Sequence, residues 1–320
     1  MTLLLTLVIG LGLLLLGASW LVDAAVAIAN RKGIPYFITG AVIVGLGTSL
    51  PEIFVAISSS LAGKGDMAVG NVLGSNLCNG MLILGAAIVI RPFKITRSNL
   101  RRDIPMAFFT TLLVMLLSFD SILPRISQNE IGRLDGVFLI IVLLCYLGYI
   151  IYSAARSNAQ ADPSKKSKIA DRPMWALVAV ALVSLVALIA GGEMFLDSAV
   201  EAARKLGVSE KLISITLVAV GTSLPELVTC VTAAVKGNPQ LAMGNVIGSN
   251  ILNLLVALGA ASLCSPIVLH SVSVLDFGVL LLGSALTFAF AFTFKKNTFD
   301  RVEGVILAAI YALYIGYLVS

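Results

Sequence analysis

The chain has 320 residues, of which 58% are apolar and 12% are charged, and its formal net charge is +5. A soluble domain is about 45–50% apolar and about 25% charged, so this composition excludes a water-soluble globule and a disordered chain. The four cysteines lie in apolar stretches without CxxC or Cys/His pairing. A disulfide-stapled scaffold is therefore excluded, and neither a zinc site nor a redox pair is indicated.

A helix that crosses a bilayer needs about 20 predominantly apolar residues. We predict ten such helices, at residues 3–29, 34–62, 67–90, 104–118, 134–153, 174–203, 209–235, 241–263, 272–293 and 302–319. The first segment lacks a basic start and is too long for a cleaved signal peptide. The sequence thus predicts an all-α polytopic membrane protein.

The basic residues predict the orientation, because all of them lie in or beside connectors between apolar segments. With both termini outside, 16 of the 22 Lys and Arg residues fall in inner connectors and six in outer ones, as the positive-inside rule requires. Topology therefore accounts for the positive charge, and we expect no nucleic-acid partner. Residues 154–173 form the long polar connector, predicted to be a flexible cytoplasmic linker, with an amphipathic surface helix as the alternative.

An internal repeat divides the chain into a first unit at 1–153 and a second at 174–320. The hexapeptide GTSLPE at 47–52 recurs at 221–226, and GNVLGSN at 70–76 recurs as GNVIGSN at 244–250. Both recur at an offset of 174 residues. Each unit holds five predicted spans, an odd number, so the second unit enters the membrane from the opposite side. Inverted repeats with interrupted helices are typical of secondary transporters whose site lies near the midplane.

Glu52 and Glu226 are the acids of the repeated hexapeptide and lie deep within predicted spans. A charged side chain at that depth costs about 2.5–3.5 kcal/mol on insertion scales. No Lys or Arg is available there to compensate, which leaves bound cations or protons. Two protonated acids bonded across the repeat interface are the structural alternative. Pro51 and Pro225 precede the acids and interrupt the helices, which exposes backbone carbonyls that can bind a cation.

Hydroxyl and amide oxygens accompany each acid in the repeated motifs. They belong to Thr48, Ser49, Ser75 and Asn79 in the first unit, and to Thr222, Ser223, Ser249 and Asn253 in the second. The set contains no sulfur or imidazole, so hard cations such as Ca²⁺ and Na⁺ are favoured over soft transition metals.

These paired motifs resemble those of the Ca²⁺/cation antiporter superfamily, and the similarity covers essentially the whole chain. The resemblance implies ten transmembrane helices arranged as two inverted five-helix repeats, with helices 2 and 7 broken at Pro51 and Pro225. It implies that the eight oxygen-bearing residues above and the two glutamates bind the ions, together with backbone oxygens near Gly45 and Ala219. It also implies a transporter of the inner membrane, not an enzyme, that needs no cofactor and no obligatory protein partner.

The expected function is export of Ca²⁺ in exchange for Na⁺ by alternating access to one central site between the repeats. Sodium coupling is favoured because proton-coupled members tend to carry a GNAxE-like element where this chain has GTSLPE. An H⁺/Ca²⁺ antiporter that uses the same two glutamates is the alternative. Asn79 and Asn253 depart from the pattern, since several sodium-coupled relatives have Asp at one of these positions, which leaves K⁺ cotransport and stoichiometry open. A cation channel and an intramembrane hydrolase are further rivals, the latter disfavoured because Ser49 and Ser223 lack a neighbouring base.

Overall fold

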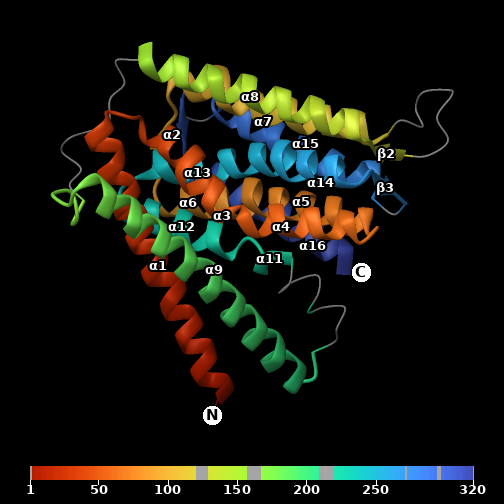
Figure 1. Ribbon diagram of the computed structural model, residues 1–320, viewed down its shortest axis with the longest axis horizontal. Helices are drawn as coiled ribbons and strands as arrows, with labels where there is room; N and C mark the ends of the chain where they lie inside the picture. Colours follow the sequence, from red (N-terminus) through yellow and green to blue (C-terminus); the bar gives the residue numbers. More distant parts are fainter. Residues whose placement is uncertain are drawn as a thin grey trace.

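The computed structural model describes residues 2–119, 129–156, 167–208, 213, 219–270, 272–293 and 297–319. Within these ranges the chain is helical apart from four short strands (Figure 1). Six described helices are long and apolar enough to cross a membrane, and a seventh span results if the bent pair Tyr36–Thr48 and Leu50–Leu61 counts as one. The protein is therefore an all-helical polytopic membrane protein.

The first half of the chain has a nearly continuous series of elements, in which η marks a π-helical turn. They are α1 (Thr2–Lys32), α2 (Tyr36–Thr39), η1 (Gly40–Val44), α3 (Gly45–Thr48), α4 (Leu50–Leu61), α5 (Gly65–Leu77), η2 (Cys78–Ile83), α6 (Leu84–Ile90), β1 (Phe93–Lys94), η3 (Asn99–Asp103), α7 (Ile104–Ser118), β2 (Asn129–Ile131) and α8 (Arg133–Arg156).

The second half repeats much of this order. Its elements are α9 (Met174–Lys205), α11 (Ala219–Gly221), α12 (Leu224–Val235), α13 (Pro239–Leu252), η6 (Asn253–Ala257), α14 (Leu258–Cys264), β3 (Ile267–Leu269), α15 (Val274–Phe290), β4 (Thr298–Phe299) and α16 (Arg301–Val319). The predicted span 209–235 is described from 219 onward and at residue 213, and residues 157–166 of the predicted linker lie outside the described ranges.

Large apolar side chains cover the outside of the long helices. Leu4, Leu144 and Val186, on α1, α8 and α9, are each more than 60% exposed. In water such a surface would be unfavourable, but lipid tails solvate it, so the exposed apolar belt agrees with a membrane-spanning protein.

Helices α1 and α9 lie side by side and run in opposite directions across one face of the bundle (Figure 1). Small residues permit the close approach, since a Cβ added to Gly10 would lie 2.7 Å from the amide nitrogen of Phe195. One added to Gly191 would lie 2.8 Å from the amide nitrogen of Leu14. Without a hydrophobic driving force between helices in lipid, such close backbone packing is what stabilises the pair.

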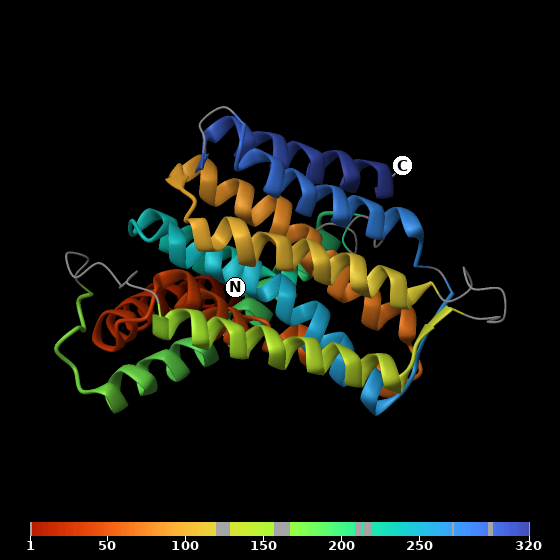
Figure 2. The same cartoon turned by 90° about the horizontal axis from the view of Figure 1, so that it is seen from above.

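The strands form two antiparallel ribbons, β1 with β4 and β2 with β3. Phe93 lies opposite Phe299 in the first ribbon, and Ile131 opposite Ile267 in the second. Figure 2 shows the ribbons at opposite ends of the bundle. Each ribbon therefore ties a connector of one half of the chain to a connector of the other half.

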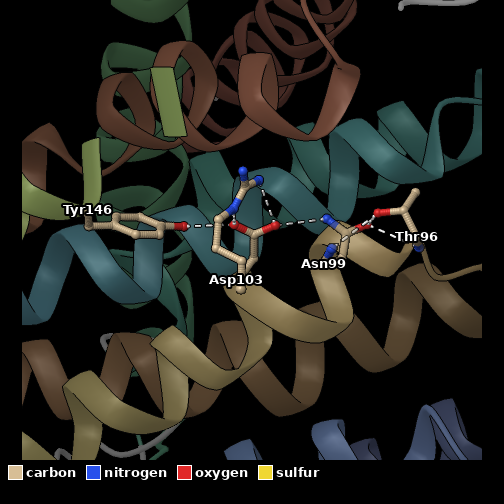
Figure 3. Close-up of polar contacts among 5 residues, drawn as sticks. Thr96, Asn99, Asp103 and Tyr146 are labelled. Atoms are coloured by element: carbon tan, nitrogen blue, oxygen red, sulfur yellow. Dashed lines mark hydrogen bonds and ion pairs between the residues drawn. The ribbon is translucent and has the colours of Figure 1, made fainter. Parts of the chain in front are cut away.

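A buried ion pair stands at the start of α7 (Figure 3). The side chain of Asp103 is fully buried, and its Oδ1 lies 2.6 Å from Nε of Arg102. Asn99 Nδ2 donates to the other carboxylate oxygen at 3.2 Å, and the Tyr146 hydroxyl donates to Oδ1 at 3.2 Å, which joins α8 to the start of α7. This acid is neutralised by a basic side chain of the protein.

The described end of the 154–173 connector is held against α1. Ser167 Oγ donates to the carbonyl of Asp23 at 2.8 Å, and Arg31 donates to the carbonyl of Ala170 at 3.1 Å. These hydrogen bonds hold residues 167–170, at the end of the predicted linker, beside the C-terminal half of α1.

Candidate cation site

Each repeated hexapeptide interrupts a helix. The axis bends by 47° between Tyr36–Thr48 and Leu50–Leu61, and in the second copy residues 222–223 separate α11 from α12. The first interruption falls at Ser49, two residues before Pro51, because proline fits the first turn of a helix, where its missing N–H is not needed. The first turns of α4 and α12 therefore carry Glu52 and Glu226, and free N–H groups at a helix start stabilise negative charge.

Glu52 and Glu226 are both completely buried. In each carboxylate one oxygen accepts a weak hydrogen bond from a serine and the other has no partner. Ser75 Oγ lies 3.4 Å from Oε1 of Glu52, and Ser49 Oγ lies 3.3 Å from Oε1 of Glu226, whereas both Oε2 atoms are buried and unpartnered. The ion pairs found among the described residues involve neither glutamate. The two acids therefore lack a protein countercharge within the described part of the chain.

Residues of the two halves meet at this site. Ser49 of the first half reaches Glu226 of the second, and Ser75 Oγ lies 3.3 Å from Oγ1 of Thr222. Ser249 Oγ in turn donates to the carbonyl of Gly45 at 3.4 Å. These hydrogen bonds join residues about 150 to 200 positions apart in sequence.

Both asparagines of the predicted set lie in π-helical turns, Asn79 in η2 and Asn253 at the start of η6. Both are completely buried. Among the described residues, neither amide atom of Asn79 has a hydrogen-bond partner, and Oδ1 of Asn253 has none. Single π-turns within α-helices are frequent at functional sites because they displace side chains from the regular spiral.

The remaining predicted residues differ in how far they are engaged. Thr48 donates to the carbonyl of Gly45 at 3.4 Å or to Oδ1 of Asn245 at 3.2 Å, so its hydroxyl is occupied. The carbonyl of Gly45 also accepts the backbone N–H of Ser49 at 3.0 Å. The hydroxyl of Ser223 is buried without a partner, and Ala219 is the first residue of α11.

Two further polar residues near the glutamates in sequence or space, Asn245 and Thr229, have no predicted role. Asn245 Nδ2 donates to the backbone carbonyl of Glu226 at 3.5 Å, and Thr229 is buried with an unpartnered hydroxyl. Asn245 belongs to the repeated GNVIGSN motif, so the repeat itself could have indicated it. Thr229 has Val55 as its equivalent in the first half, and no sequence pattern points to it.

The chemistry of the cluster is that of hard oxygen donors. The two carboxylates lie among serine and threonine hydroxyls, and Asn79 and Asn253 carry buried amide oxygens. The described residues contain no group of three or more His, Cys, Asp or Glu side chains placed to hold a metal. Such a donor set suits Ca²⁺, or Na⁺ with fewer ligands, and disfavours soft metals. Unpartnered carboxylate and amide oxygens in a buried site are unfavourable unless a cation or a proton is bound.

The family model described as sodium/calcium exchanger protein matches residues 2–152 and 176–320. Among curated proteins, the inner membrane protein YrbG of Escherichia coli is 32% identical over 98% of this chain and 95% of its own length. The sodium/calcium exchanger MaX1 of Methanosarcina acetivorans is 28% identical over 97% of both chains.

Among solved structures, the sodium-calcium exchanger NCX_Mj, soaked with Na⁺ and Ca²⁺, superimposes with a TM-score of 0.83 at 28% sequence identity. The match covers 99% of this chain and 98% of that one. Sequence and fold similarity therefore extend over both halves and the polar cluster between them.

Proposed function

Since the chain belongs to the sodium/calcium exchanger family, we propose that it is an antiporter of the inner membrane that exports Ca²⁺ in exchange for Na⁺. The proposed architecture is ten transmembrane helices in two inverted repeats, interrupted near Pro51 and Pro225. The antiparallel pairing of the equivalent helices α1 and α9 supports the inversion.

The observation that carries this proposal is the pair of buried glutamates. Glu52 and Glu226 come from the two halves, are both fully buried, and each keep one carboxylate oxygen without a partner. The two negative charges balance the charge of one Ca²⁺. With the neutral oxygens around them as further ligands, they can also hold two or more monovalent ions. The same cage can therefore hold either kind of ion.

The proposed ligands are the residues of the repeated motifs. They are Thr48, Ser49, Glu52, Ser75 and Asn79, the equivalents Thr222, Ser223, Glu226, Ser249 and Asn253, and the backbone oxygens of Gly45 and Ala219. An empty site with two bare carboxylates resists movement across the low-dielectric centre of the membrane, whereas a neutralised site can be exposed to either side. Exchange is then obligatory, because the protein reorients only when ions are bound.

Radiolabelled Ca²⁺ flux into proteoliposomes tests the proposal. We expect uptake when an outward Na⁺ gradient is imposed, saturation with external Ca²⁺, and no uptake without a counter-ion inside. Uptake driven by a pH gradient in the absence of Na⁺ would replace sodium coupling with proton coupling at the same glutamates. Flux that neither saturates nor needs a counter-ion would contradict antiport and indicate a channel.

A further inference from the structure

Two equivalent asparagines, Asn76 on α5 and Asn250 on α13, bond to each other at the centre of the molecule. Asn76 Nδ2 donates to the backbone carbonyl of Asn250 at 3.0 Å, and Asn250 Nδ2 donates to the carbonyl of Asn76 at 3.2 Å. The residues are separated by the repeat offset of 174 positions. Because a carbonyl can only accept, these bonds fix which end of each side-chain amide is the NH₂ group.

The fixed amide of Asn76 in turn orients a residue of the cation site. With its NH₂ group turned to Asn250, Asn76 presents Oδ1 on its other side, and Asn253 Nδ2 donates to that oxygen at 3.1 Å. Asn253 is fully buried, and the bond leaves its Oδ1 as the free end, with no protein partner. A chain of donors and acceptors thus runs from a backbone carbonyl to an oxygen available for a cation.

The equivalent bond in the other half is not made in this structure. By symmetry Asn79 Nδ2 would donate to Oδ1 of Asn250, yet both atoms are buried and unpartnered. The two half-sites therefore differ: the amide of Asn253 is oriented, whereas that of Asn79 is not.

We propose that Asn76, itself held by Asn250, is a positioning residue that makes Asn253 present oxygen, and not NH₂, to the bound cation. The proposal rests on the proposed function. A carboxylate offers oxygen in either orientation, but an amide turned by 180° offers a donor that repels a cation. An asparagine in the site therefore needs a group that fixes its amide, and Asn76 bears the required acceptor for Asn253.

A double-mutant cycle tests this with Ca²⁺ binding to the purified full-length protein, measured by calorimetry in Na⁺-free buffer. Asn76→Leu should weaken binding about tenfold, or about 1.4 kcal/mol. In the Asn253→Asp background, where both terminal atoms are oxygens, Asn76→Leu should change binding less than about twofold. The structural effect of losing the Asn76–Asn250 bonds is common to both backgrounds, whereas the bond that orients Asn253 can be lost only where residue 253 is asparagine.

Asn71→Leu is the matched control on the same helix, because no hydrogen bond joins Asn71 to Asn253; it should affect both backgrounds alike. If Asn76→Leu fails to give monodisperse protein, Asn76→Ala takes its place in both backgrounds. Equal losses of Ca²⁺ affinity in the wild-type and Asn253→Asp backgrounds would overturn the positioning role while leaving the proposed function intact. A wild-type protein that binds no Ca²⁺ would instead overturn the proposed function, and the positioning role with it.

Discussion

At the scale of single residues, the acids of this protein fall into two groups with different energetics. Asp103 is buried beside Arg102, so its charge is compensated within the protein. Glu52 and Glu226 are equally buried, and the side-chain hydrogen bonds they accept in the described part of the chain come from uncharged groups. A buried charge without a partner is strongly unfavourable. Their charge is therefore available for an ion from outside the chain.

Replacing either acid with its neutral isostere should remove exchange. Glu52→Gln and Glu226→Gln each delete one of the two charges that balance Ca²⁺, and we expect Na⁺-dependent Ca²⁺ flux in proteoliposomes to fall at least about 100-fold, the size of a lost ionic interaction of about 3 kcal/mol. Membrane insertion should be unchanged. Glu201→Gln is the control, since Glu201 is exposed in a surface pair with Lys205 and should keep wild-type flux. Retained flux in either site variant would remove that glutamate from the ion site.

At the scale of elements, equivalent helices of the two halves are packed differently. In α13, a Cβ added to Gly248 would lie 2.4 Å from Cα of Ala41, and one added to Gly244 would lie 2.1 Å from the carbonyl oxygen of Phe37. In α5, Cβ atoms added to Gly70 and Gly74 would meet nothing within 4 Å. These two glycines instead line a cavity of about 280 Å³ between α5, α15 and α16. The sequence repeat is thus closely packed in one half and open in the other.

This difference predicts opposite effects of one substitution at equivalent positions. Gly248→Ala places a methyl group against the backbone at Ala41 and should destabilise the protein by about 1–3 kcal/mol. Gly74→Ala meets no neighbour and should be neutral, or stabilising by up to about 1 kcal/mol, because alanine is the better helix former. Thermal unfolding in detergent, followed by thiol-reactive dye or tryptophan fluorescence, compares the two variants directly. Equal destabilisation would contradict the asymmetric packing.

The end of α12 is tied to α1 by a partly buried ion pair. Lys236 Nζ lies 2.8 Å from Oδ1 of Asp23 and donates to the carbonyl of Ser19 at 2.7 Å. The side chains of Lys236 and Asp23 are 26% and 16% exposed, whereas those of Lys205 and Glu201 are 62% and 56% exposed. The interaction is therefore shielded from solvent more than an ordinary surface pair.

A double-mutant cycle of Asp23→Asn and Lys236→Met should show a coupling energy of about 1 kcal/mol or more in stability. The same cycle on Glu201 and Lys205 should give less than about 0.5 kcal/mol, as expected of an exposed pair one helical turn apart. Thermal unfolding of the four variants of each cycle measures both. Coupling as weak at Lys236 as at Lys205 would show that the pair does not hold α12 to α1.

At the scale of the whole molecule, lipid replaces water around most of the surface. Apolar side chains are exposed on the outer helices, while the polar cluster lies in the centre, between the two halves. This inside-out distribution follows from the solvent, because lipid cannot satisfy the hydrogen bonds of polar groups. The charge bias of the connectors then predicts how the bundle is inserted.

Cysteine labelling checks that orientation. Lys64 and Arg97 are exposed residues of connectors that the charge count assigns to opposite sides. In a background with Cys78, Cys145, Cys230 and Cys264 replaced, a membrane-impermeant maleimide should label Lys64→Cys in intact cells. Arg97→Cys should react only after permeabilisation, and the reverse pattern would contradict the predicted topology.

Composition and hydropathy patterning predicted the class of protein and the bounds of most described helices to within a few residues, and the repeat singled out Glu52 and Glu226. Composition and apolar run length are local properties, so they predict the helix α7, found at residues 104–118, and the membrane-length helix α9. The constant repeat offset pointed to the polar residues of the two motifs, because the same side chains recur 174 positions later in the chain. The resemblance to a known superfamily added the expected transport function.

The contacts among these residues could be found only from the three-dimensional packing of the chain. Packing between the two halves sets three features of the site. They are the contact of Ser49 with Glu226, the unpartnered amide of Asn79 and the bond from Asn253 to Asn76. Near-identical repeated motifs could not reveal that Gly74 faces a cavity while Gly248 touches Ala41. The reason is physical: local sequence fixes backbone preference and side-chain chemistry, but the neighbours of a buried atom are set by segments distant in the chain.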